Sequence, residues 1–529
     1  MKQIPARLLA SLLALGLVLA ACGGTPAASP TAAPEAAQAT AAPQPTSAPL
    51  ATAAPEATAA APTAAEAPTE AAAAATEEPT VEPTQVVKVD PSAVKVDPNK
   101  VQIRWYCCLG TGESPEQVEV EQKVVEEFNA SHPKIQLILE VITYNAARDT
   151  LSTEIASGNP PDIVGPVGVG GANAFAGQWL DLSEQIKKTN YDLSQFDKGA
   201  VDFYKVGGEG QVGLPFAIYP SELYYQRKLF DEAGLKYPPH KYGEKYTMPD
   251  GKEVEWDFDA LAQIAKILTV DEQGKDASEA DFDPKKVTQY GYLEQWPADV
   301  RDIGAWFGAD SLVEKDGKTA RIPPQWAESW KWHYDGMWKS HFMPNNDAQN
   351  TPTFGAGNPF NSGKIAMALS FLWYTGSMEP DSVGKDWDIA VVPSFKGKTT
   401  ALLNADTFRI MKATKHPDEA FEVLNYLLGE AAPQLLQTYG AMPARKSDQQ
   451  AFFDTLNQTW PQKVDWQVAL DGIAHTDIPS FEASMPNYNE AIDRCVTFWN
   501  LMTTSPDLDM DKEIDTFKTD LQAIFNKKS

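Results

Sequence analysis

The spacing of apolar residues predicts a regular succession of strands and helices near the start of the patterned part of the chain. Residues 101–106 alternate like a strand, residues 135–142 form a second apolar strand, and Ile163 begins a third. Apolar positions at helical spacing separate these strands at residues 116–129 and again at residues 144–158. The order strand, helix, strand, helix, strand is that of a parallel α/β layer, whose loops at the strand ends share one side.

An uninterrupted apolar run occupies Ile365 to Leu372, directly after the turn pair Ser362-Gly363. The run is too short for a free-standing helix and too continuous for a half-exposed strand, so it predicts a strand covered on both faces. Trp373 and Tyr374 follow it, and ligands bind at this end of the strands in open α/β sheets. The pair is therefore a candidate ligand surface, with burial in the core as the alternative.

Aromatic residues are concentrated between Tyr290 and Trp338. Trp326 and Trp330 are four residues apart on a predicted helix, which places both on one face, and we assign them to the core. Trp296 follows a turn-prone stretch and precedes a proline, which favours a loop. A ligand contact and a structural role for Trp296 both stay open.

Five further residues close to predicted strands are candidates for ligand contact. Cys108 and Tyr144 follow the first and second strands, and Gly168 belongs to a glycine-rich loop that allows a ligand to approach the backbone. Asn404 and Asp406 lie between two apolar stretches, where their side chains could supply hydrogen bonds. The alternative for Asp406 is a cap or turn, where aspartate is common.

The sequence disfavours catalytic and cofactor sites of several kinds. The glycines at 168–171 lack the basic residue of a phosphate-binding loop, the six histidines lack metal-ligand spacing, and no Gly-x-Ser-x-Gly motif occurs. Glu222 or Glu294 acting as acid and base on a glycoside is the remaining enzymatic alternative. We predict a protein that is not an enzyme and that holds neither a cofactor nor a metal ion.

The N-terminal residues have the pattern of an export signal. Basic residues precede a short apolar run from Leu8 to Ala21, which predicts a secretory signal at residues 1–21 rather than a membrane span. Leu19-Ala20-Ala21-Cys22 resembles the bacterial lipobox, in which cleavage before the cysteine is followed by its acylation; an ordinary signal peptide with an incidental cysteine is the alternative. Lipidation of Cys22 predicts an extracytoplasmic protein held on the cell membrane by its lipid alone.

Composition divides the rest of the chain. Residues 22–98 are almost all Ala, Pro, Thr and Glu without aromatic residues, which predicts a disordered tether and leaves residues 99–529 for the folded part. The formal net charge of -28 argues against nucleic acid as a partner, because phosphates would be repelled. Cys107, Cys108 and Cys495 remain in the folded part, and their pairing stays open.

Several short phrases occur in a fixed order between residues 100 and 450. They are Ala156-Ser157-Gly158-Asn159-Pro160-Pro161-Asp162-Ile163, Leu214-Pro215-Phe216, Gly363-Lys364-Ile365-Ala366-Met367, Trp387-Asp388-Ile389-Ala390-Val391-Val392-Pro393 and Ala441-Met442-Pro443-Ala444-Arg445. In this order the chain resembles the extracellular solute-binding proteins of ABC importers, the family that includes the maltose-binding protein. The resemblance implies an α/β, two-lobed fold of the periplasmic-binding-protein type (type II), with a ligand cleft between the lobes.

The same resemblance implies lobe boundaries and site residues. Lobe 1 would comprise residues 99–214 and 388–438, and lobe 2 residues 215–387 and 439–529. The aromatic position of the family's carbohydrate cleft falls on Trp373, and the ligand-facing position after the Pro-Phe strand falls on Tyr219. The acid-then-aromatic element of the family falls on Glu294 and Trp296.

The implied function is the capture of a mono- or oligosaccharide and its delivery to ABC permease subunits. Aromatic rings rimmed by hydrogen-bonding groups suit the apolar faces and hydroxyls of sugars. Pro166 to Gly171 stands where the maltose-type proteins have a polar, charged loop, which argues against maltose itself. A surface sensor with the same fold and a peptide or polyamine ligand stay open as alternatives.

Overall fold

The computed structural model describes residues 89–384, 386–476 and 485–527. The predicted signal segment, Cys22 and most of the predicted tether lie outside the described residues. Residues 89–98, the end of that tether, include an antiparallel bridge between Val89 and Val141. Within the described part, none of the helices combines the length and the apolarity needed to cross a bilayer.

The first lobe is built on the strands that the N-terminal pattern predicts. β1 (Val101–Cys107) pairs in parallel with β2 (Ile135–Val141) and with β3 (Ile163–Val167), and α1 (Pro115–Ser131) and α2 (Tyr144–Ala156) connect them. A late strand, β15 (Leu403–Ile410), completes this side of the sheet antiparallel to β3. We refer to β1, β2, β3 and β15 as the strands of the first lobe. The predicted strand and helix order is confirmed.

The second lobe contains the apolar run at residues 365–372. This run forms β11 (Ile365–Phe371), a strand in which every residue is buried, as its sequence predicts. β11 pairs in parallel with β10 (Val287–Glu294), and β9 (Val270–Asp271) is antiparallel to β10. We refer to these three as the strands of the second lobe; β12 (Trp387–Ala390), at the predicted lobe boundary, pairs with β6.

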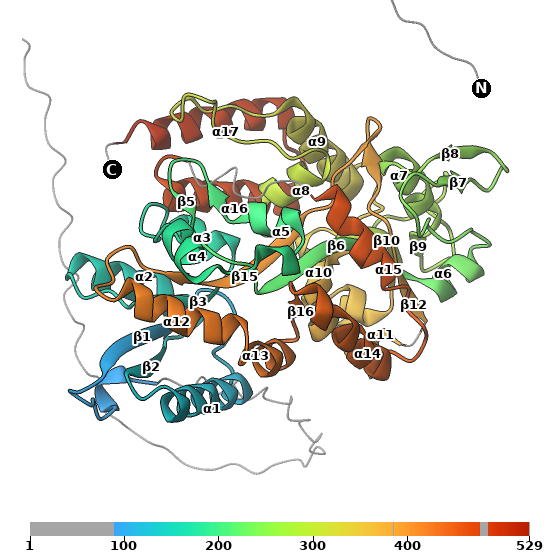
Figure 1. Cartoon of the computed structure of the whole chain (residues 1–529). Helices are drawn as coiled ribbons and strands as arrows, with labels where there is room; N and C mark the ends of the chain where they lie inside the picture. Colours follow the sequence, from blue (N-terminus) through green and yellow to red (C-terminus); the bar gives the residue numbers. More distant parts are fainter. Residues whose placement is uncertain (1–88, 385, 477–484, 528–529) are drawn as a thin grey trace, which may run out of the picture. The chain divides into compact units, whose positions relative to one another are not determined.

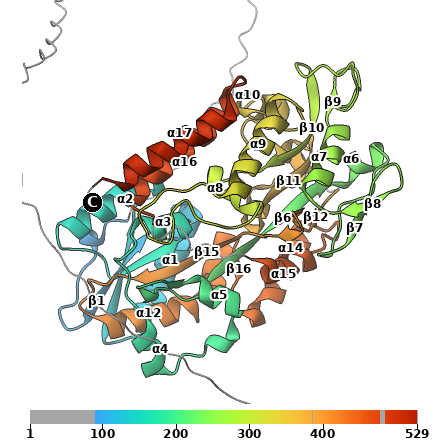
Figure 2. The same cartoon turned by 90° about the horizontal axis from the view of Figure 1, so that it is seen from above.

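A single long strand, β6 (Ala217–Gln226), joins the two lobes, and all ten of its residues are buried. Its first half pairs with β15 and with β16 (Met442–Pro443), whereas its second half pairs with β11 and β12. In Figures 1 and 2, β1 lies to one side of β15 and β6, and β10 and β9 lie to the other. Residues contributed by β6 and β15 are therefore close to both lobes.

Helices cover the sheet, and α16 contacts elements of both lobes. α12 (Pro417–Leu428) packs on β15 and β1, and α7 (Phe258–Ile267) packs on β10. α16 (Tyr488–Thr504) contacts α8 (Val300–Trp306), α9 (Pro324–Trp338) and α10 (Asn346–Gln349) as well as α3 (Val169–Ala174). The remaining α-helices of the described part are α4 (Ser183–Thr189), α5 (Lys198–Phe203), α6 (Arg227–Glu232), α11 (Pro380–Val383), α13 (Ala432–Tyr439), α14 (Gln449–Thr459), α15 (Gln467–Gly472) and α17 (Met510–Phe525). The short strands form hairpins: β4 (Lys205–Val206) with β5 (Gly210–Gln211), β7 (Lys245–Thr247) with β8 (Glu253–Glu255), and β13 (Ser394–Phe395) with β14 (Lys398–Thr399).

Two features of the first lobe differ from the sequence pattern. The third strand, β3, continues through Gly165 and Pro166, and a Cβ at Gly165 would come within 2.7 Å of the Phe408 Cα on β15. Only glycine permits that approach. On α1 the buried face includes Glu121, with Val120 only partly buried. The spacing of apolar residues cannot predict that the Glu121 carboxyl is buried on this helix.

The tryptophans assigned to the core are buried as expected. Trp326 and Trp330 are both fully buried on α9, and their indole N–H groups donate to the backbone carbonyls of Gly308 and Val300 at 3.0 and 2.7 Å. These hydrogen bonds satisfy the indole N–H groups, which would be destabilising if they were buried without an acceptor.

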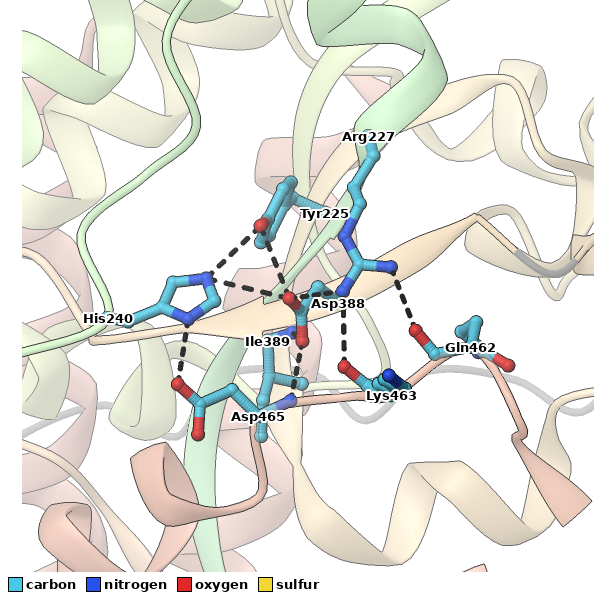
Figure 3. Close-up of polar contacts among 8 residues, drawn as sticks. All are labelled: Tyr225, Arg227, His240, Asp388, Ile389, Gln462, Lys463 and Asp465. Carbon is cyan, nitrogen blue, oxygen red and sulfur yellow. Dashed lines mark hydrogen bonds and ion pairs between the residues drawn. The ribbon is translucent and has the colours of Figure 1, made fainter. Parts of the chain in front are cut away.

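An ion-pair network ties β6 and β12 to the chain that precedes α15 (Figure 3). The Asp388 carboxylate accepts from Arg227 Nη2 at 2.5 Å and from the Asp465 backbone N–H at 2.8 Å. His240 lies between Tyr225, at 3.1 Å from the hydroxyl, and Asp465, at 2.9 Å from the carboxylate. The Asp388 side chain is only 5% exposed, so its charge depends on these partners rather than on water.

Glu222, in the middle of β6, gives a testable pH dependence. Its side chain is 1% exposed, and neither carboxyl oxygen has a hydrogen-bond partner among the described residues. Burial raises the pKa of this carboxyl well above its ordinary value. The folded chain therefore keeps a proton that the unfolded chain releases above about pH 4.3, and stability falls with rising pH by at most ~1.4 kcal/mol per unit from this group.

We expect Glu222→Gln to remove this contribution. The difference in free energy of unfolding between the variant and the parent, measured by urea titration, should then move in favour of the variant from pH 5 to pH 7. A constant offset from the new amide does not affect that slope. Glu119→Gln, at an exposed position on α1, is the matched control and should retain the parent's slope. Identical slopes for Glu222→Gln and the parent would contradict the assignment.

Candidate functional site

A cavity of about 680 Å³ is lined by residues of both lobes. Its volume falls within the range of ~300–1,000 Å³ that small-molecule sites occupy. The lining is rich in aromatic rings with a few polar side chains among them. The described residues that line it are Gly110, Thr111, Tyr144, Gly168, Val169, Gly170, Tyr219, Ala298, Arg301, Asp302, Ala305, Phe371, Trp373, Leu402, Leu403, Asn404, Asp406, Tyr439 and Tyr488.

β6 and β15 bring three of the predicted residues together at the cavity. Asn404 is the register partner of Tyr219 across the two strands, and Asp406 lies two residues further along β15. Because side chains alternate along a strand, Asn404 and Asp406 project from the same face of β15. All three residues line the cavity, so the strands β6 and β15 at the junction of the lobes form part of its wall.

Loops at the ends of the first-lobe strands line another part of the cavity. Gly110 and Thr111 follow β1, Tyr144 begins α2, and Gly168 precedes α3. A Cβ at Gly168 would meet Asp406 Oδ1 at 2.9 Å, so a larger residue there would displace the carboxylate. Gly168 therefore contributes by leaving room for Asp406.

The second lobe provides the main aromatic surface. Phe371 ends β11 and Trp373 follows it, with their rings 5.9 Å apart and 21° from parallel. Both line the cavity. The strand end predicted from the apolar run thus carries Trp373 to the place where the lobes meet.

Trp296 continues this aromatic surface beyond the cavity lining. Its ring is 6° from parallel to that of Trp373, at a centroid distance of 6.3 Å, and its side chain is 42% exposed. The backbone has φ of 56°, which is uncommon for a residue with a large side chain, and the indole N–H donates to the Gly357 carbonyl at 2.8 Å. A strained and exposed tryptophan held in place by a hydrogen bond is typical of a functional surface.

The charged groups of the cavity are not balanced. Arg301 is held by Asp299, which accepts from Nε at 2.8 Å and from Nη2 at 2.6 Å and is 1% exposed. Asp302 accepts one backbone hydrogen bond from Ala298, and no described residue donates to the Asp406 carboxyl. Burial raises the pKa of Asp302 and of Asp406 to about 6 in each case. Both acids are therefore mostly ionised at neutral pH, and both are only partly exposed.

Besides Trp296, three candidate residues are placed outside the cavity lining. Tyr374 is fully buried and donates to Asn358 Oδ1 at 2.6 Å. Glu294 is buried against α9, where it accepts from the Tyr292 hydroxyl at 2.8 Å and pairs with His333. Cys108 is fully buried. Tyr374 therefore belongs to the core, which was the alternative to a ligand contact. The Glu294 carboxylate points into the core because it pairs with His333.

Cys107 and Cys108 are joined in a disulfide, which answers the pairing question that the sequence leaves open. Cys495 is buried on α16 and takes no part in that bond. Glu121 lies beside the pair, and burial raises the pKa of its carboxyl to about 8. Among the described residues, these two cysteines and Glu121 form the group with metal-ligand spacing, but the disulfide engages both sulfurs.

Several cavity residues have no recognisable signal in the sequence. Arg301 and Asp302 belong to the first turn of α8, and Tyr439 ends α13, where its pattern resembles an ordinary core position. Gly110 and Thr111 follow β1 in the same way that Gly168 follows β3. The rule that loops after strands line a site finds the two loop residues, whereas the helix residues need the tertiary structure.

Comparison with known proteins identifies the family. The family model described as bacterial extracellular solute-binding protein matches residues 112–433, which is more than half of the chain. A protein of Brucella abortus (strain 2308) described as a binding protein is 22% identical over 345 residues, which cover 62% of this chain and 73% of that protein. The chain belongs to the bacterial extracellular solute-binding proteins, a family of binding proteins.

Solved structures agree on the fold. The ABC substrate-binding protein Lmo0181 of Listeria monocytogenes, solved with cycloalternan, has a TM-score of 0.59 at 19% identity and covers 81% of this chain and 100% of its own. The sugar-binding protein MalE of Xanthomonas citri has a TM-score of 0.60 at 16% identity and covers 80% of this chain and 97% of its own. The predicted two-lobed, maltose-binding-protein-like α/β fold is confirmed.

Proposed function

We propose that this protein captures a carbohydrate in the cavity between its lobes and delivers it, chemically unchanged, to an ABC permease. The observation that carries the proposal is the cavity lining. Trp373 and Phe371 offer flat apolar rings, and Tyr219 on β6 and Asn404 and Asp406 on β15 offer hydrogen-bonding groups. Sugars have apolar C–H faces bordered by hydroxyls, and this lining matches both features.

The similar structures support the same ligand class. Lmo0181 was solved in complex with cycloalternan, and the protein of Arthrobacter globiformis with a TM-score of 0.58 binds cyclic alpha-maltosyl-1,6-maltose. Trp296 adds an exposed ring next to Trp373, which would suit an oligosaccharide longer than the cavity itself. We infer that the ligand has two or more sugar units.

Ligand binding would favour a closed arrangement of the lobes. A ligand that touches Tyr219 and Asp406 at the junction and Trp373 on the second lobe makes more contacts when the lobes are close. Such differential contact is the requirement for shifting a conformational equilibrium. The closed state is what a permease would recognise.

We further propose a lipid anchor at Cys22 and a tether at residues 22–98. The apolar run before Cys22 and the Ala/Pro/Thr composition after it support this. In a bacterial expression host, the parent should partition into the detergent phase and carry acyl chains by mass spectrometry. Cys22→Ala should remain in the aqueous phase, and an acylated Cys22→Ala product would contradict the proposal.

Isothermal titration calorimetry of the full chain tests the carbohydrate assignment. The panel consists of mono- and oligosaccharides, with spermidine and a tripeptide as ligands of other classes. We expect saturable one-to-one binding of at least one saccharide and none of the other classes. Binding of spermidine or the peptide without any saccharide would overturn the proposed function.

A further inference from the structure

Among the residues that the structure describes, the acidic groups of the cavity outnumber its cations. Among the described lining residues the charged side chains are Arg301, Asp302 and Asp406. The guanidinium of Arg301 is already engaged by the buried carboxylate of Asp299, which contacts two of its nitrogens. The two remaining carboxylates therefore give the cavity a net negative charge, in a protein whose formal charge is already -28.

Both carboxylates are partly buried in the cavity wall, which makes the imbalance costly. Asp406 lies against Gly168 at the junction of the lobes, surrounded by Tyr219 and Tyr439, and no described residue donates to its carboxyl. Asp302 accepts a single backbone hydrogen bond. A partly buried charge with few hydrogen-bond donors is destabilising, and a further cation within reach would offset part of that cost.

Six aromatic rings line the same cavity as the two carboxylates, and together they suit a ligand that carries a positive charge. Ammonium groups are attracted to the faces of aromatic rings as well as to carboxylates. The rings belong to Tyr144, Tyr219, Phe371, Trp373, Tyr439 and Tyr488. A neutral sugar hydroxyl could donate to either carboxylate, but it would leave both charges uncompensated.

We propose that the cavity selects carbohydrates that carry an ammonium group, with Asp406 and Asp302 as the specificity-determining residues. This inference rests on the proposed carbohydrate function and deepens it. Acidic sugars are disfavoured, because the cavity's guanidinium is engaged by Asp299 and the remaining charges are negative. Neutral sugars bind through the rings and hydroxyls but gain nothing from the carboxylate charges.

Matched saccharides that differ at one position test the proposal. The probes are glucose with glucosamine and glucuronate, galactose with galactosamine and galacturonate, and cellobiose with the disaccharide of two glucosamine units, titrated into the full chain at pH 7.5. We expect the amino member of at least one set to bind at least tenfold more tightly than its hydroxyl parent, and the uronates to bind no more tightly than the parents.

Isosteric variants separate charge from shape. Asp406→Asn and Asp302→Asn should each lower the ratio of amino to hydroxyl affinity about tenfold, whichever way the absolute affinities move. Asp259→Asn removes an exposed carboxylate on α7 and should leave that ratio unchanged. Thermal unfolding of each variant confirms that it is folded, and the two independent positions keep the test decisive if one variant does not fold.

The outcomes distinguish this inference from the proposed function. Equal or tighter binding of the hydroxyl parents overturns the ammonium selectivity and leaves the carbohydrate function intact. A preference for amino sugars that survives both Asp→Asn substitutions also overturns it. Binding of spermidine without any saccharide, or no binding by any saccharide, overturns both proposals together.

Discussion

Replacing Asp388 by alanine is expected to lower the free energy of unfolding by about 3–5 kcal/mol, the usual cost of removing one member of a buried ion pair. The substitution leaves the Arg227 guanidinium, whose side chain is 18% exposed, without its carboxylate, and leaves the Asp465 backbone N–H without its acceptor. Urea denaturation monitored by tryptophan fluorescence measures the loss. The expected result is a lower midpoint with an unchanged denaturant slope.

Three variants test the physical cause. Asp388→Asn keeps an acceptor for the Asp465 N–H and should cost less than the alanine change. Arg227→Met combined with Asp388→Leu removes both charges and should recover part of the loss, since apolar replacements of buried pairs are often tolerated. Asp386→Ala, at an exposed position just before β12, is the control and should be nearly neutral. Equal losses for Asp386→Ala and Asp388→Ala would contradict the role of the network.

The position of this network explains why it matters for function. Asp388 lies on β12, which pairs with the second half of β6, and Arg227 directly follows β6. Gln462 and Lys463, whose carbonyls accept from Arg227, belong to the chain that returns after α14 (Figure 3). The network therefore fixes one end of the strand whose other half carries Tyr219 to the cavity.

The sequence was sufficient for those parts of the site where local pattern and site position coincide. The apolar run of β11 determines where Trp373 lies, because a strand buried on both faces ends where its apolar residues end. Asn404 and Asp406 are also expected from the sequence, since both lie between apolar stretches, whereas Tyr219 is expected only from the resemblance to the family. The structure brings all four to one cavity.

Other positions could not be found, because their environment is set by distant parts of the chain. Tyr292 and Glu294 are two residues apart on β10 and share a face, but His333 on α9 pairs with the carboxylate inside the core, which no local pattern predicts. Arg301 and Asp302 reach the cavity only because α8 packs beside α9 and α16. The position of a buried charged side chain depends on partners far away in the sequence. A buried strand, in contrast, can be predicted from its own run of apolar residues.

Trp373→Ala is expected to weaken binding of the tightest saccharide of the panel by about 1–4 kcal/mol, a loss of roughly 5- to 1,000-fold in affinity, in the range of aromatic hot spots. The substitution removes the ring that lies between Phe371 and Trp296 and lines the cavity. Trp373→Phe keeps a flat ring and should retain most of the affinity. Trp499→Ala truncates a partly buried tryptophan on α16 outside the cavity lining, and calorimetry should show unchanged affinity even if it lowers stability. Trp373 lies directly after the strand β11, whose apolar pattern indicates a site. If a folded Trp373→Ala protein bound the saccharide as tightly as the parent, Trp373 would have only a packing role and the ligand would not bind against this ring.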